Sequence, residues 1–193
     1  MTTTSAPAGT DRWSMSPDRA VFLSRIINIA ALFGLILVLA GSLHLQFGVG
    51  EQPCPLCIVQ RSGMIGLAVG PIMNLLWGMS PRHYALSILA AVAGGAGSTR
   101  QILLHIADPN DPGYGPTVFG WHLYTWALIT FMVVIAFAGF VLLFGHEFVP
   151  IAPQARWART LAWVIVWIFI ATIAMNMLVV FAEEGFNWYL PDD

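Results

Sequence analysis

Five long stretches of apolar residues constrain this chain more than any other feature of its sequence. They cover about residues 26–46, 58–77, 84–107, 121–144 and 161–182. Since a helix needs about 20 apolar residues to cross a hydrocarbon core of roughly 30 Å, each stretch is long enough to span a membrane. Short connectors that contain Pro and Gly separate the stretches. The sequence therefore predicts an all-α integral membrane protein.

Composition supports this class and excludes others. Hydrophobic residues make up 58% of the chain and charged residues 9%, whereas soluble domains carry about 25% charged residues. All eight basic residues are arginine and they form no basic patch, so nothing points to nucleic acid as a partner. Two cysteines are too few for a small secreted disulfide scaffold.

The charged residues predict an orientation in the membrane. Basic residues near the ends of spans mark the cytoplasmic side. One set of span ends carries Arg12, Arg19, Arg25, Arg82, Arg156 and Arg159. The opposite ends carry mainly acidic residues, with Glu51 close to the cysteines. We therefore expect a cytoplasmic N-terminus and cysteines that face the extracytoplasmic side, which in bacteria is oxidising.

The motif CPLCIVQR at 54–61 holds both cysteines at the start of the second apolar stretch. Pro suits the first position of a helix, so Pro55 predicts Cys54 as the N-cap and Cys57 in the first turn. Free N–H groups and the helix dipole at that end favour a thiolate. Arg61 lies four residues after Cys57, on the same helix face, where a guanidinium in a membrane is a candidate functional group. This arrangement favours thiol–disulfide exchange.

Two other interpretations of the cysteine pair stay open at this point. A lone CxxC is also found in metal sites, but zinc needs four ligands and no second CxxC or HxxxH is present. A mixed site with His44, His105 or His122 remains an alternative, and it would make the chain a non-enzymatic metal-handling or assembly protein. The cysteines could also be buried structural thiols.

The CPLCIVQR motif follows one apolar stretch and opens the next. In sequence and in position it resembles the motif of the DsbB family of bacterial disulfide bond formation proteins. Arg100, Gln101 and His105 in the third stretch, and the segment at 115–128, are similar to the same family. The resemblance implies a four-helix transmembrane bundle over 21–145. Residues 1–20 are polar and rich in Thr, Ser and Ala, so they are expected to be a disordered cytoplasmic tail. Residues 146–193 are expected to add a fifth transmembrane helix and an extracytoplasmic tail.

The resemblance also implies a function in the bacterial inner membrane. Such a protein oxidises a periplasmic thioredoxin-like, DsbA-type dithiol and passes two electrons to a quinone, either ubiquinone or menaquinone. By position, Cys54 would react with the partner and Cys57 with the quinone. Arg61 would bind and polarise the quinone ring. A quinone-linked enzyme of the vitamin K epoxide reductase type is chemically close, but normally relies on additional cysteines.

Three polar residues of the third apolar stretch complete the expected site. Arg100 and Gln101 are expected to face the bundle interior, where they would line the quinone pocket or support Arg61. His105 is a candidate proton donor to the reduced quinone, because imidazole titrates near neutral pH. His44 and Gln46, near the end of the first stretch, are further candidates.

The sequence departs from the family in one respect. Typical members carry a second cysteine pair in the loop between the third and fourth spans, but residues 108–120 contain no cysteine. An internal relay between two pairs is therefore impossible in this chain. The partner dithiol could attack Cys54–Cys57 directly, another protein could supply the missing pair, or the substrate range could be narrower. The first is favoured, because a short loop would uncover Cys54.

Overall fold

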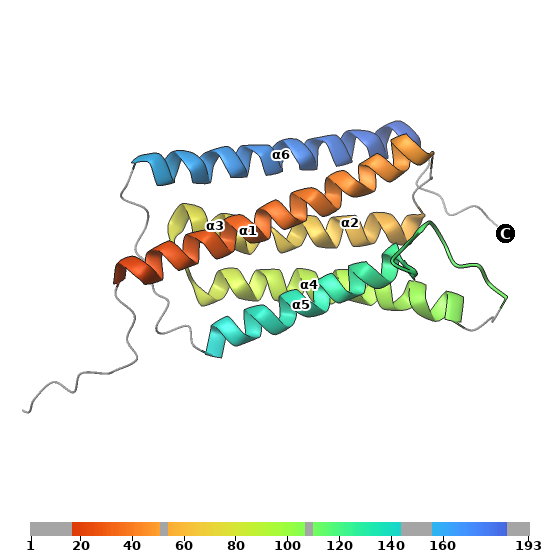
Figure 1. The fold of residues 1–193 in the computed structure, drawn as a ribbon, viewed down its shortest axis with the longest axis horizontal. Coiled ribbons are helices and arrows are strands. Elements are labelled where there is room, and N and C mark those ends of the chain that lie inside the picture. Colours follow the sequence, from red (N-terminus) through yellow and green to blue (C-terminus); the bar gives the residue numbers. More distant parts are fainter. Residues whose placement is uncertain (1–16, 51–53, 107–109, 144–155, 185–193) are drawn as a thin grey trace, which may run out of the picture.

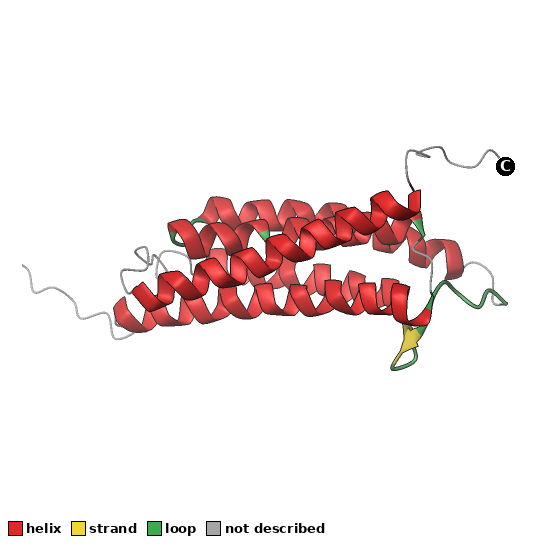
Figure 2. Ribbon diagram, turned by 90° about the horizontal axis from the view of Figure 1, so that it is seen from above, coloured by secondary structure: helices red, strands yellow, loops and turns green. Residues whose placement is uncertain are grey.

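The computed structural model describes residues 17–50, 54–106, 110–143 and 156–184. Over these ranges the chain forms long helices that run side by side in one bundle (Figure 1). A short hairpin lies at one end of the bundle (Figure 2). The elements are α1 (Pro17–His44), the π-helical turn η1 (Leu45–Val49), α2 (Pro55–Leu67), α3 (Val69–Trp77), α4 (Pro81–Ile106), β1 (Thr117–Val118), β2 (Trp121–His122), α5 (Leu123–Leu143) and α6 (Arg156–Glu184).

The all-α membrane fold is confirmed. Four stretches in the described ranges are long and apolar enough to cross a membrane: Val21–Val49, Pro55–Trp77, Leu123–Leu143 and Arg159–Ala182. They correspond to four of the five expected spans. The expected tail over 1–20 falls mainly outside the described residues, and its last residues, from Pro17 on, are already helical.

The remaining expected span, the third in chain order at 84–107, is helix α4, and its composition differs from that of the other four. Its 26 residues give a length of about 39 Å, and it lies alongside α2 and α5 (Figure 1). Small residues fill 90–98 and polar residues follow at 99–101, so α4 is not among the four apolar spans. Close packing explains this composition, because small residues let helices approach.

The second span is interrupted at Ala68, between α2 and α3. Pro71 has no N–H and cannot bond to the carbonyl of Leu67, four residues earlier. The hydroxyl of Ser87, from α4, donates to that carbonyl at 2.9 Å. Buried Ser side chains are one way in which membrane proteins satisfy backbone groups freed by proline. The interruption is therefore stabilised by a neighbouring helix.

Glycines bring α2 close to α4. A Cβ built on Gly63 would lie 2.7 Å from the Cα of Gly94, and one on Gly66 would lie 2.8 Å from the Cβ of Ala90. Non-bonded contacts this short are essentially never made by a real Cβ atom, so larger residues would push the helices apart. Helix α2 is thereby held against α4, and both helices carry residues of the site described below.

Helix α6 shares the core with the rest of the bundle. Phe169 of α6 and Leu32 and Leu39 of α1 are fully buried in one cluster. The cluster also includes Phe131 of α5. Helix α6 thus packs on α1 and α3, on the opposite side of the bundle from α5 (Figure 1).

A buried polar cluster joins three helices at the end of the bundle remote from the cysteines. Asn74 of α3 donates to the side-chain oxygen of Asn28 in α1 at 3.0 Å. The Asn74 oxygen lies 2.9 Å from Nδ1 of His83 in α4. The amide of Asn28 also donates to the Ser24 carbonyl at 2.7 Å. Buried amides that are paired in this way fix the relative positions of their helices.

Candidate functional site

The cysteine pair lies at the start of α2, as the sequence predicts. Cys54 is the N-cap and Pro55 the first helical residue. Cys54 and Cys57 form a disulfide, with their Cα atoms 5.0 Å apart. The backbone N–H of Cys57 donates to Sγ of Cys54 at 3.1 Å. A free N–H group of the helix end therefore donates to the sulfur of Cys54.

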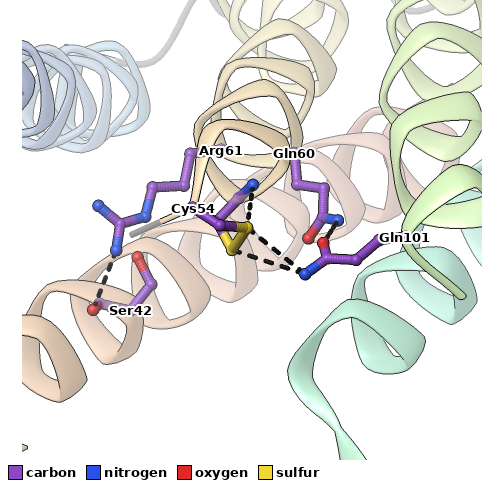
Figure 3. Close-up of a disulfide and its surroundings, with 6 residues drawn as sticks. Ser42, Cys54, Gln60, Arg61 and Gln101 are labelled. Carbon is purple, nitrogen blue, oxygen red and sulfur yellow. Dashed lines mark hydrogen bonds between the residues drawn. A yellow bond between two sulfur atoms is a disulfide. The ribbon is translucent and has the colours of Figure 1, made fainter. Parts of the chain in front are cut away.

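A glutamine from α4 donates to this disulfide (Figure 3). Nε2 of Gln101 lies 3.4 Å from Sγ of Cys54 and 3.9 Å from Sγ of Cys57. A disulfide sulfur carries no proton, so only the NH₂ group of the amide can bond to it. Oε1 of Gln101 then accepts from Nε2 of Gln60 at 2.7 Å. Both glutamines are buried, with 2% and 6% of their surface exposed, so Gln60 holds Gln101 in place.

Arg61 extends toward α1, away from Gln101 (Figure 3). Nη1 of Arg61 donates to Oε1 of Gln46 at 2.7 Å, and Nη2 donates to the Ser42 carbonyl at 3.3 Å. The guanidinium thus joins α2 to the end of α1. It remains on the same side of α2 as Cys57, because both side chains line one cavity.

The cavity has a volume of about 550 Å³, within the range of small-molecule sites. Helices α1, α2, α4 and α5 and the hairpin segment surround it. Its polar residues include Gln46, Cys57, Gln60, Arg61 and Gln101. Most of the remaining lining is apolar, from residues such as Leu37, Met64 and Ala127. A flat, mainly apolar ring with polar oxygens suits such a lining.

The expectation that Arg100 faces the bundle interior is wrong. Arg100 is exposed on α4 and does not line the cavity. The buried face of α4 includes Ser87, Ala91, Gly94, Ser98 and Gln101. These positions are spaced by four and three residues, which keeps them on one face of a helix. Arg100 immediately precedes Gln101, about 100° around the helix, so the two cannot share that face.

His105 lies beside the cavity and is not part of its lining. Its Nδ1 lies 2.7 Å from Oδ2 of Asp111, and its ring stacks on Tyr124 with centroids 5.5 Å apart. Tyr124 does line the cavity. The hydrogen bond from His105 holds the pKa of the Asp111 carboxyl below its usual value, and the N–H of Gly113 adds to this effect. His105 therefore ties the segment after α4 to the start of α5.

The hairpin segment forms part of the cavity wall. Its turn residues Phe119 and Gly120 have φ angles of 51° and 80°, as expected of a two-residue hairpin. Trp126 of α5 donates to the Val118 carbonyl at 2.9 Å. Tyr114, Val118 and Trp126 all line the cavity. Neither these residues nor Gln60 was predicted from the sequence, although the amide of Gln60 within an apolar stretch was a visible signal.

Within the described residues, no group of three or more His, Cys, Asp or Glu side chains is placed to hold a metal ion. Two of the histidines in the mixed-site alternative have other contacts: His105 with Asp111, and His122 with the Gly115 carbonyl at 3.2 Å.

The fold and this site define a multi-pass membrane protein with a disulfide that fits a redox-active centre beside a ring-sized cavity. Comparison with known families gives a match over residues 24–112 to the family described as disulfide bond formation protein DsbB. Over residues 24–112 the chain is thus similar to the DsbB family.

Individual relatives have the same description. The chain is similar to disulfide bond formation protein B of Aromatoleum aromaticum, with 33% identity over 102 residues that cover 51% of this chain and 58% of the relative. The protein of that name from Verminephrobacter eiseniae is 39% identical over 104 residues, 48% of this chain and 55% of the relative. The one from Burkholderia ambifaria is 28% identical over 160 residues, 61% and 89% of the two chains.

The matched region thus spans little more than half the length of the first two relatives. No solved structure matches the chain at a significant level.

Proposed function

We propose that this protein is a membrane thiol–disulfide oxidoreductase that oxidises a soluble dithiol through Cys54–Cys57 and passes the electrons to a quinone. One observation carries the proposal: the Cys54–Cys57 disulfide lies at a cavity of about 550 Å³ that Cys57 and Arg61 line together. The names of the relatives, disulfide bond formation protein B, support the same reaction class.

The first half of the reaction is an exchange at the disulfide. A thiolate of the substrate attacks Sγ of Cys54, the Cys54–Cys57 bond breaks, and Cys57 leaves as a thiolate. The second substrate thiol then attacks the substrate sulfur that is bonded to Cys54 in the mixed disulfide. This releases Cys54 and leaves the substrate with a new disulfide. Attack at Cys54 is favoured because it lies at the N-cap, at the end of the bundle, whereas Cys57 lines the cavity.

The chain's own polar groups stabilise the charge that this exchange creates. The amide of Gln101 donates toward both sulfurs, and hydrogen bonds to a charged group are stronger than those to a neutral one. The backbone N–H of Cys57 serves Cys54 in the same way.

The residues around the cavity fit a quinone. Its mainly apolar lining suits the ring, and Arg61, Gln60 and Gln101 supply polar contacts near Cys57. When bound, a quinone would take up two electrons and two protons, becoming a quinol as Cys54 and Cys57 return to the disulfide. Ubiquinone and menaquinone both meet this description.

We further propose the bacterial inner membrane as the location, with the cysteines facing the periplasm. The helix ends near Arg19, Arg82 and Arg156 gather at the end of the bundle opposite the disulfide (Figure 1). Basic residues at that end favour a cytoplasmic position for it. A periplasmic thioredoxin-like protein of the DsbA type is then the proposed partner. Since residues 108–120 contain no cysteine, we propose direct attack of its dithiol on Cys54.

The test is reconstitution of the purified protein with a reduced DsbA-type protein and a quinone. Loss of partner thiols should accompany an equal molar loss of quinone absorbance, and either Cys54→Ser or Cys57→Ser should abolish both. The Cys57→Ser variant should also accumulate a mixed disulfide between Cys54 and the partner. Quinone consumption that persists without Cys54 would refute the proposal. A failure to trap the partner on Cys54, with turnover intact in the unmodified protein, would refute only the direct attack.

A further inference from the structure

Gln46 lines the cavity beside Cys57, and the NH₂ group of its side chain has no hydrogen-bond partner in the described part of the chain. Its side chain is 5% exposed and lines the cavity. Its Oε1 accepts from Nη1 of Arg61 at 2.7 Å. Its Nε2 is buried and has no hydrogen-bond partner among the residues that the structure describes. A buried donor without a partner costs free energy, so such a group calls for an explanation.

The orientation of this amide follows from the chemistry of Arg61. A guanidinium has only donors, so the atom of Gln46 that faces it must be the oxygen. The amide cannot turn to pair its nitrogen without breaking that contact. The NH₂ group is therefore held in place as a donor, and the group that satisfies it must be a hydrogen-bond acceptor.

The backbone at Gln46 gives a second, independent observation. Residues Leu45–Val49 form a π-helical turn at the end of α1, a rare element that is frequent at functional sites. His44 precedes the turn, and a Cβ built on Gly48 would lie 3.1 Å from the His44 ring. The turn brings Gln46 into contact with Arg61 of α2.

We propose that Nε2 of Gln46 donates a hydrogen bond to a carbonyl oxygen of the quinone in this cavity, and that Arg61 positions this donor. This inference rests on the proposed function and names the residue that recognises the acceptor. The amide is polarised, because its oxygen faces a guanidinium. With a quinone bound, the N–H of this amide would therefore stabilise negative charge on the quinone oxygen.

Binding of a short-chain ubiquinone to the purified full-length protein tests this role without turnover. Gln46→Leu removes the donor, and Gln46→Glu keeps the size and the contact with Arg61 but has no N–H to donate. Loss of one neutral hydrogen bond should weaken binding about two- to tenfold in Gln46→Leu. Gln46→Glu should weaken it at least as much, because its carboxylate also faces the acceptor oxygen. The infrared spectrum of the bound quinone gives a second readout, since a hydrogen-bonded carbonyl absorbs at lower frequency. That lowered band should return to the unbonded position in both variants.

Ser98→Ala is the matched control. The hydroxyl of Ser98 is also fully buried and lacks a partner in the described residues, but it does not line the cavity. This variant should bind quinone as the unmodified protein does. If quinone binds the unmodified protein and both Gln46 variants equally, with unchanged carbonyl bands, the role of Gln46 is refuted and the proposed function stands. If the unmodified protein binds no quinone, both fall.

Discussion

Replacement of Gln101 by leucine separates the electrostatic role of this residue from its structural one. In the unmodified protein, Nε2 of Gln101 donates to Sγ of Cys54 at 3.4 Å and to Sγ of Cys57 at 3.9 Å. After reduction of the disulfide, the same N–H groups face thiolates. Gln101→Leu removes this donation and also leaves the buried amide of Gln60 without its acceptor.

The lost donation to the sulfurs and the unpaired amide of Gln60 have different magnitudes, and a second substitution can reverse only the latter. A hydrogen bond to a charged group contributes about 1.5–3 kcal/mol, and the long sulfur contacts point to the lower value. About 1.4 kcal/mol corresponds to a factor of ten in an equilibrium constant. At a fixed pH, alkylation of Cys54 should therefore slow about tenfold, and that of Cys57 by less. The unpaired Gln60 amide costs about 1–3 kcal/mol of stability. The double variant Gln60→Leu with Gln101→Leu should recover most of that stability.

Alkylation of single-cysteine proteins reports the first effect, and thermal unfolding in detergent reports the second. Cys57→Ser leaves Cys54 to be measured, and Cys54→Ser leaves Cys57. We expect Gln101→Leu to slow the alkylation of Cys54 more than that of Cys57. The double variant should keep the slower rates although its stability returns. Unchanged rates in a folded Gln101→Leu protein would show that the amide does not stabilise either thiolate.

Three further predictions concern the framework of the site. Ser87→Ala should lower the free energy of unfolding by about 1–3 kcal/mol, because it leaves the Leu67 carbonyl freed by Pro71 without a donor. Gly66→Ala should lower the unfolding temperature, since the new Cβ would meet Ala90 at 2.8 Å. The contact between His105 and Asp111 contributes its full stability at pH values above the usual pKa of a carboxyl group. This stability should be lost as the pH falls through the lowered pKa of Asp111. Hydrogen exchange in residues 110–116 should then rise.

Controls for these predictions come from the same chain. Ser98→Ala removes a hydroxyl with no partner in the described residues and should leave the unfolding temperature unchanged or raise it. An equal loss in Ser87→Ala and Ser98→Ala would contradict the role given to Ser87. Gly139 has no atom within 4 Å of a built Cβ, so Gly139→Ala should be tolerated where Gly66→Ala is not. Asp111→Asn should remove the pH dependence of exchange, and a persistent dependence would place its origin elsewhere.

Local features of the sequence were enough to predict the helices and the start of α2. Helix α5 is apolar on all sides, so its length alone indicated a span. The position of Cys54 as N-cap followed from Pro55 in the next position. Both predictions depend on neighbouring residues and not on the tertiary structure.

Contacts between distant residues could not be predicted in this way. The interruption at Ala68 has a local cause in Pro71, but its stability depends on Ser87, 20 positions after Leu67. The pairing of Gln60 with Gln101 joins residues 41 positions apart, and nothing local says which of their atoms meet. The exposed position of Arg100, in contrast, could have been predicted, because the spacing of the small and polar residues of α4 places Arg100 off the buried face.

The amide cluster of Asn28, Asn74 and His83 has a mechanical consequence for the opposite end of the molecule. It fixes α1, α3 and α4 to one another far from the disulfide. Spreading the helices at that end would break buried hydrogen bonds, whereas a small outward tilt of α1 near Gln46 leaves them intact. We therefore expect a bulky, lipid-soluble molecule that enters beside Cys57 to displace α1 near Gln46 at the cost of the Arg61 contacts there, while the amide cluster holds α1 at its other end.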